Sequence, residues 1–166
     1  MSRGFVKEED QEEKPIIPPR AALPAGVTNY VTERGYQDLE EEKIELEAER
    51  KSVSHENETE RRRAVAVIDG KIALLNERIS SARIIYAKDQ PKDEVRFGAT
   101  VTLKINGKSQ EFKIVGVDEA DVKKKRIAFV APIAKAITGK KEGEQTNFKL
   151  GEEERNIEII SINYDD

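Results

Sequence analysis

The sequence has 166 residues and a formal net charge of −4, from 29 lysines and arginines against 33 aspartates and glutamates. Charged and hydrophobic residues each make up 37% of the chain, and aromatic residues only 5%. This balance predicts a small core beside a long, solvated element rather than one large globule. With no cysteine and one histidine, the composition argues against disulfides, thiolate metal sites and most hydrolase or metalloenzyme chemistry.

No targeting or membrane segment is predicted. The start, Met1 to Lys7, has no apolar core of a signal peptide and turns acidic at Glu8. The longest apolar-rich stretch, residues 127–137, is interrupted by Pro132 and Lys135 and is shorter than the roughly 20 residues that a membrane helix needs. We therefore expect a cytoplasmic protein with no membrane partner. The mild acidity also argues against nonspecific binding to duplex DNA.

Residues 1–29 are predicted to form an extended or disordered N-terminal arm. They hold four of the six prolines, and proline removes backbone donors and biases its neighbour away from the helix. A solvated tail is the simplest interpretation. Four apolar residues of the arm are nevertheless available for docking: Phe5, Val6, Ile16 and Ile17.

Two helices are predicted, near residues 33–53 and 58–82. Thr32 is suited to cap the first, and Asn57 with Glu60 forms a capping-box pattern for the second. Apolar residues recur at three- and four-residue steps in both segments. They are Tyr36, Leu39, Leu46 and Val53 in the first and Val65, Ile68, Ile72, Leu75, Ile79 and Ala82 in the second.

The two apolar stripes match as an antiparallel hairpin. Facing residues in such a hairpin have a constant sum of residue numbers, and Leu39 with Ile72 and Leu46 with Val65 both sum to 111. That sum places the turn between His55 and Glu56, with arms about 30–37 Å long at 1.5 Å per residue. An ordinary helix bundle is the alternative, but polar Lys43 and Arg50 in the seam favour a thin, solvated hairpin over residues 30–86.

From Arg96 the pattern alternates, which predicts a small sheet domain within residues 87–166. Strands are expected at 97–105, 110–117, 126–130, 147–150 and 156–164, and Asn106-Gly107 is a strong hairpin turn. Pro132 is expected to begin a short helix that ends near Gly139. The predicted fold class is α+β.

The order of these motifs resembles the GreA/GreB family of bacterial transcription elongation factors. The resemblance covers about residues 30–164, and Met1 to Asp10 also looks like the arm of a divergent subgroup with a short hairpin. The segments that carry it are Tyr30-Val31-Thr32-Glu33-Arg34-Gly35, Phe97-Gly98-Ala99-Thr100-Val101-Thr102, Ile114-Val115-Gly116-Val117-Asp118-Glu119-Ala120-Asp121, Ala131-Pro132-Ile133-Ala134 and Gly139-Lys140-Lys141-Glu142-Gly143-Glu144.

The resemblance implies a coiled-coil hairpin followed by an FKBP-like antiparallel sheet domain with a short helix. In the family, the sheet domain docks on the rim of the secondary channel of RNA polymerase and the hairpin enters the channel. Acidic residues at the tip help to hold the second Mg²⁺ of the polymerase, which then cleaves backtracked RNA. The factor is not an enzyme and has no cofactor or metal of its own. Its expected partners are RNA polymerase and, indirectly, the RNA and DNA of the elongation complex.

Two departures from the family pattern affect the expected activity. The tip keeps only an acidic-Asn-acidic fragment, so its candidate carboxylates are Glu56, Glu58 and Glu60, which are equally suited to a solvated helix start. Each arm is also about two helical turns, or about 11 Å, shorter than the family hairpin. A carboxylate must lie within roughly 2.1 Å of Mg²⁺ to bind it, so a shortfall of this size argues against metal binding by the tip.

The remaining candidate site residues have a binding and a structural interpretation each. Arg61, Arg62 and Arg63 would contact RNA or an acidic channel wall, or form a solvated face. Val130, Ala131 and Pro132 match the polymerase-contacting Ser-Pro segment of the family, or Pro132 simply starts a helix. Asp118, Glu119 and Asp121 would contact a partner, or hold a loop through turn hydrogen bonds. His55 is expected to be a turn residue.

The sequence thus favours a polymerase-binding regulator of elongation without strong stimulation of transcript cleavage. The alternatives are a cleavage-stimulating factor that supplies tip carboxylates, a peptidyl-prolyl isomerase suggested by the FKBP-like fold, and a coiled-coil adaptor for another protein. The isomerase needs an aromatic-lined pocket, and the few aromatic residues fall mostly at predicted core positions.

Overall fold

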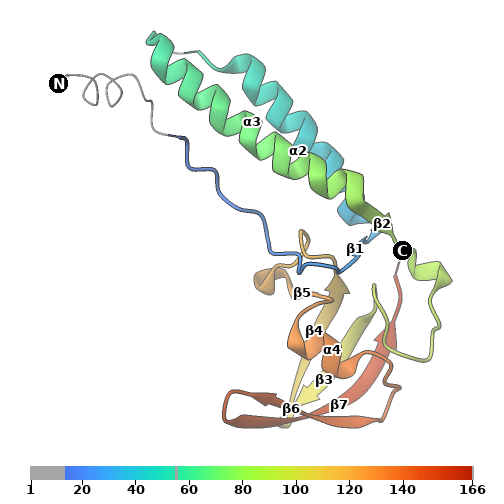
Figure 1. Cartoon of the computed structure of the whole chain (residues 1–166). Helices are drawn as coiled ribbons and strands as arrows, with labels where there is room; N and C mark the ends of the chain where they lie inside the picture. The colour runs from blue at the N-terminus through green and yellow to red at the C-terminus, as the bar shows by residue number, and fades with distance from the viewer. Residues whose placement is uncertain (1–13, 55, 166) are drawn as a thin grey trace.

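The structure, a computed structural model, describes residues 14–54 and 56–165. Two long helices, α2 (Glu33–Ser52) and α3 (Glu58–Ser81), project as a pair from a sheet domain, as Figure 1 shows. The predicted helix bounds are confirmed to within one residue at each end. Phe5, Val6 and His55 lie outside the described residues, so their predicted roles stay predictions.

Both predicted helix caps are present. The Thr32 hydroxyl accepts a hydrogen bond from the backbone N–H of Gly35 at 2.9 Å. The Asn57 side-chain oxygen accepts from the N–H groups of Thr59 at 2.8 Å and Glu60 at 3.3 Å. These bonds satisfy amides that have no partner within the helix, which is why each helix begins where it does.

A narrow apolar seam joins the two helices. Its buried side chains are Val31, Leu39, Leu46, Ile68 and Leu75. Arg50, one of the polar residues predicted in the seam, forms an ion pair across the two helices: its guanidinium lies 2.6 Å from the Asp69 carboxylate of α3, and both side chains are about half exposed. The pair is therefore the thin, solvated hairpin that the polar seam residues predicted.

The sheet domain contains five strands in the order β5-β4-β3-β7-β6. The strands are β3 (Thr100–Ile105), β4 (Lys108–Val115), β5 (Arg126–Ala128), β6 (Gln145–Leu150) and β7 (Glu153–Asn163). Asn106 and Gly107, with φ of 48° and 85°, form the predicted turn between β3 and β4. Helix α4 (Pro132–Ile137) buries Ala134 and Ile137 in the core of this sheet.

Two expectations about the sheet are wrong. The sheet is mixed rather than antiparallel, because β5 pairs in parallel with the end of β4. The chain makes this crossover through residues 116–125, which include the short 3-10 helix η2 (Val122–Lys124). The first strand also begins at Thr100 rather than Phe97, since Gly98 adopts a φ of +88° that interrupts the extended backbone.

A second, two-stranded sheet closes the base of the hairpin and was not predicted. In it β1 (Asn29–Val31) pairs in parallel with β2 (Ala82–Ile84). Strands of three residues are too short to show a periodic pattern in sequence. The 3-10 helix η1 (Ala87–Asp89) then leads into the sheet domain. Within residues 14–54 and 56–165, none of the helices is long and apolar enough to cross a membrane.

Candidate functional site

The tip of the hairpin carries the three candidate carboxylates, and all three residues are exposed. The Glu58 carboxylate accepts hydrogen bonds from the Arg61 guanidinium at 2.8 and 3.3 Å. These bonds lower the pKa of Glu58 and raise the pKa of Arg61. Glu58 is thus held by its own helix, three residues before its partner, in the first turn where negative charge is favourable.

Metal-binding geometry is missing from the described part of the tip. Across residues 14–54 and 56–165, no group of three or more His, Asp or Glu side chains is arranged to hold a metal ion. The three basic residues Arg61, Arg62 and Arg63 lie exposed on the first turns of α3. Glu58, Glu60 and these arginines therefore lie on the first turns of α3, with Glu58 and Arg61 paired, while Glu56 lies just before the cap of the helix.

Asp118 lies at the junction between the hairpin and the sheet domain. Its two carboxylate oxygens accept hydrogen bonds from Arg20 Nε and Arg78 Nη1, each at 3.0 Å. The side chain is only 6% exposed. Its carboxylate is thus used within the chain, by one arginine from the N-terminal arm and one from α3.

Glu119 binds the start of α2. Its carboxylate accepts from the Thr32 hydroxyl at 2.5 Å and from the Thr32 N–H at 3.2 Å. It also lies directly against Gly35, where a Cβ atom would fall 2.3 Å from the carboxylate carbon. Asp121 makes the turn hydrogen bond that the structural interpretation expected, accepting from the Lys123 N–H at 3.0 Å.

We expect Thr32→Val to lower the free energy of unfolding by about 1–2 kcal/mol. Valine has nearly the same shape, but it cannot cap Gly35 or donate to Glu119, and Thr32 is only 8% exposed. Urea denaturation followed by circular dichroism measures the change. Thr59→Val serves as the control, because Thr59 lies next to the cap of α3 and donates to Asn57 through its backbone N–H, which the substitution keeps. Equal losses in the two variants would contradict the assignment.

Val130, Ala131 and Pro132 lead into α4. Pro132 is the first residue of the helix and is exposed, whereas Val130 and Ala131 are half-buried. Ala131 packs against the sheet core. The expected helix start is therefore present, and Pro132 itself is exposed.

An aromatic cluster is the main feature that the sequence did not indicate. The rings of Tyr30, Phe97 and Phe129 lie 5.6–6.1 Å apart, centre to centre, in tilted and edge-to-face arrangements. Together with Arg83 and Arg96 they line a hollow of about 360 Å³. The rings come from three segments that are far apart in the sequence, so no local pattern could reveal the cluster.

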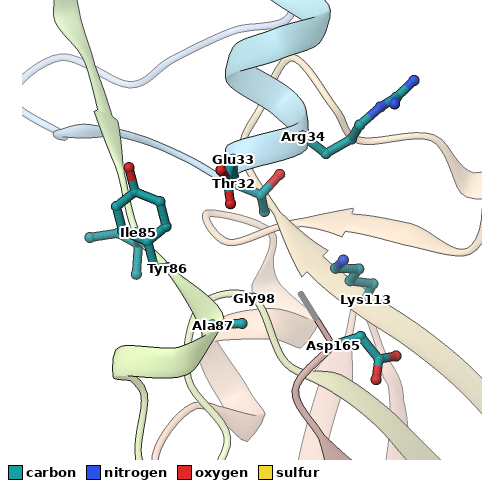
Figure 2. Close-up of a pocket in the computed structure, with 9 residues that line it drawn as sticks. All are labelled: Thr32, Glu33, Arg34, Ile85, Tyr86, Ala87, Gly98, Lys113 and Asp165. Carbon is teal, nitrogen blue, oxygen red and sulfur yellow. The ribbon is translucent and has the colours of Figure 1, made fainter.

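Figure 2 shows a smaller cavity of about 50 Å³ where the start of α2 meets the sheet domain. Its walls include Thr32, Tyr86, Lys113 and Asp165. Sites for small molecules usually measure about 300–1,000 Å³. This cavity is therefore part of the packing between hairpin and sheet rather than a substrate site.

Comparison with known proteins identifies the family. A family model described as "Transcription elongation factor, GreA/GreB, C-term" matches residues 90–164. The chain is 34% identical to transcription elongation factor GreA of Thermodesulfovibrio yellowstonii over 152 residues, which covers 81% of this chain and 96% of that protein. The chain therefore belongs to the GreA/GreB family of transcription elongation factors.

Two further comparisons cover different shares of the relatives. The match to GreA of Hyphomonas neptunium is 38% identical over 99 residues; it covers 58% of this chain and 63%, less than two thirds, of that relative's length. A solved structure of a GreA/GreB elongation factor from Nitrosomonas europaea is 18% identical, with a TM-score of 0.40, over 81% of this chain and 98% of that chain.

Proposed function

We propose that the chain binds RNA polymerase at the rim of its secondary channel and regulates transcription elongation, without strong stimulation of transcript cleavage. In this role the protein is not an enzyme itself and requires no cofactor of its own. Family membership supports the polymerase as partner. The exposed Pro132 at the start of α4, with half-buried Val130 and Ala131 beside it, supplies the contact segment.

The paired state of Glu58 is the observation that favours a cleavage-free role. A carboxylate that supports a second Mg²⁺ must be able to turn its oxygens toward the metal. Here the Glu58 oxygens are already bound by Arg61 of the same helix.

The length of the hairpin supports the same conclusion. The 20 residues of α2 span about 30 Å at 1.5 Å per residue. This is about 11 Å short of the hairpin that the family resemblance implies. Such a hairpin occupies the channel but keeps its tip carboxylates several bond lengths from the metal site of the polymerase.

A transcript-cleavage assay on backtracked complexes tests the proposal. We expect the protein to co-purify with RNA polymerase and to leave the cleavage rate within about twofold of the rate without factor, a change worth less than 0.5 kcal/mol in barrier. The triple variant Glu56→Ala, Glu58→Ala, Glu60→Ala should behave in the same way. A large increase in cleavage that the triple variant abolishes would establish the cleavage-stimulating alternative.

A matched control keeps the number of removed charges equal. The variant Glu40→Ala, Glu41→Ala, Glu45→Ala removes three exposed acids from α2, each at least seven residues before its tip end at Ser52. If both triple variants lose polymerase binding, the charge of the hairpin rather than its tip chemistry governs the interaction. If the parent protein fails to co-purify with the polymerase at all, the adaptor function replaces the proposal.

The aromatic hollow is the candidate site for the alternative function, peptidyl-prolyl isomerase activity. Tyr30, Phe97 and Phe129 form the kind of aromatic wall that the sequence had not predicted. Turnover of a proline-containing peptide, lost in Phe129→Ala, would show this activity. We favour the regulator because each of these rings also packs against another, which accounts for the cluster structurally.

A further inference from the structure

Part of the N-terminal arm lies against the hairpin instead of in solvent. Figure 1 shows the described arm running beside α3 before it reaches β1. Ile17 packs onto Gly70 of α3 so closely that a Cβ atom at Gly70 would fall 1.9 Å from Ile17 Cδ1. Glycine inside a helix costs about 1 kcal/mol relative to alanine. This contact explains why a glycine stands inside the helix: because Gly70 has no side chain, it leaves a notch in α3 that receives Ile17.

Arg20 links the arm to both parts of the fold. Its Nη1 and Nη2 atoms donate to the Glu42 carboxylate of α2 at 2.5 and 3.1 Å. Its Nε atom donates to Asp118 of the sheet domain at 3.0 Å. The Arg20 side chain is only 18% exposed, and its hydrogen bond to Glu42 is the main cause that raises the pKa of Arg20. One arm side chain thus spans hairpin and sheet.

Arg78 of α3 completes this junction. It donates to the second oxygen of Asp118 at 3.0 Å and also to the backbone carbonyl of Ala21 in the arm. Asp118 therefore joins three segments that are far apart in the sequence. The use of both carboxylate oxygens by two guanidinium groups fixes the direction of each partner.

The arm is held at these points and bridges open space between them. Hollows of about 430 and 590 Å³ lie beside it, lined partly by Pro19, Arg20 and Leu74. Pro18 and Pro19 restrict the backbone to an extended form, which lowers the entropy lost on docking. Contacts of this kind can open without disturbing either hydrophobic core.

We propose that residues 17–21 form a strap that docks into a site made by the Gly70 notch and the Asp118 junction, and that the docked strap fixes the orientation of the hairpin on the sheet domain. The strap is a segment of this chain, and its charge is opposite to that of the site: the positive Arg20 faces the negative Glu42 and Asp118. The inference concerns the isolated protein, so it stands or falls independently of polymerase binding.

Tryptic cleavage after Arg20 reports whether the strap is docked. The next residue is Ala21, so the bond is a trypsin site, and the docked guanidinium is shielded. Gly70→Gln should accelerate this cleavage at least about tenfold, equivalent to about 1.4 kcal/mol of docking free energy. Glutamine fills the notch but favours the helix more than glycine does, so displacement is not confused with unfolding of α3. Asn76→Gln adds the same side chain at an exposed position of α3 and should cleave at the parent rate.

The distance between hairpin and sheet reports the orientation. Because the chain has no cysteine, spin labels can be placed at Ser54→Cys and Ser109→Cys, both exposed. Electron–electron double resonance should give one narrow distance distribution for the parent and the Asn76→Gln control, and a broader one for Gly70→Gln. Arg20→Lys keeps the charge and the trypsin site but loses the planar fork, and should also accelerate cleavage and broaden the distribution.

Three results would overturn the proposal. Parental cleavage rates in both Gly70→Gln and Arg20→Lys would show that these residues do not dock the strap. Faster cleavage with an unchanged distance distribution would show that the strap does not set the orientation. The same effects in Asn76→Gln would show that they do not depend on the notch. Circular dichroism checks that each variant is folded, and Arg20→Lys carries the test if Gly70→Gln is not.

Discussion

Asp118→Asn should lower the free energy of unfolding by about 3 kcal/mol. Removing one member of a buried ion pair costs about 3–5 kcal/mol, because it leaves the other charge without compensation. Here Arg20 and Arg78, whose side chains are 18% and 15% exposed, lose the carboxylate that they share. We expect the lower end of the range because Arg20 keeps its bonds to Glu42. The midpoint of urea denaturation measures the loss.

Asp69→Asn is the matched control for this prediction. Asp69 also pairs with an arginine, Arg50, but both side chains are about half exposed. Solvent-exposed ion pairs contribute about 0–1 kcal/mol, so the control should change stability by less than 1 kcal/mol. If the two substitutions have equal effects, burial does not strengthen the Asp118 junction and our account of it is wrong.

Leu75→Ala should have the largest effect on the hairpin, a loss of about 3–4 kcal/mol. Leu75 is fully buried, and truncation of a buried leucine costs about 2–5 kcal/mol through lost burial and the cavity that remains. Among the described residues the seam has five buried side chains, one of them Val31 of β1, so few neighbours can move to fill the gap. Urea denaturation followed at the helical circular dichroism signal measures the change.

Hydrogen exchange locates the same effect within the molecule. Amides of α2 and α3 should lose protection in Leu75→Ala, while those of β3 and β7, which pack in the separate sheet core, should keep theirs. Ile44→Ala is the control, since Ile44 is 68% exposed on α2 and its loss should change stability by no more than about 0.5 kcal/mol. A loss below 1 kcal/mol for Leu75→Ala would contradict the assigned seam.

Local signals in the sequence were enough to predict the hairpin and most of the sheet. Helix periodicity, the caps at Thr32 and Asn57 and the Asn106-Gly107 turn all depend on residues close together in the chain, where propensity and hydrogen bonding act directly. The parallel pairing of β4 with β5 depends on the route of the ten residues between them. No short pattern encodes such a route, so that part of the fold could not be predicted.

The candidate site shows the same division. The tip carboxylates and Pro132 lie at the surface positions that their motifs predicted, but the partners of Asp118 and Glu119 could not be predicted. Their contacts, Arg20 and Thr32, lie 98 and 87 residues earlier in the chain. The sequence presented these acids equally well as partner contacts or loop anchors, and only tertiary packing shows that both bind within the chain. The sequence offered Ile17 as a residue available for docking, but its partner Gly70, 53 residues later in the chain, could not be predicted.

The contact between Glu119 and Gly35 has a mechanical consequence. It holds α2 near its first turn, and Ser52, 17 residues after Gly35, lies about 26 Å farther along the helix. A rotation of the hairpin about this contact therefore displaces its far end most. A rotation of about 5° there would move the far end by about 2 Å, similar to the bond length from an oxygen ligand to Mg²⁺. Small changes in packing around Glu119 thus become atomic-scale displacements at the tip.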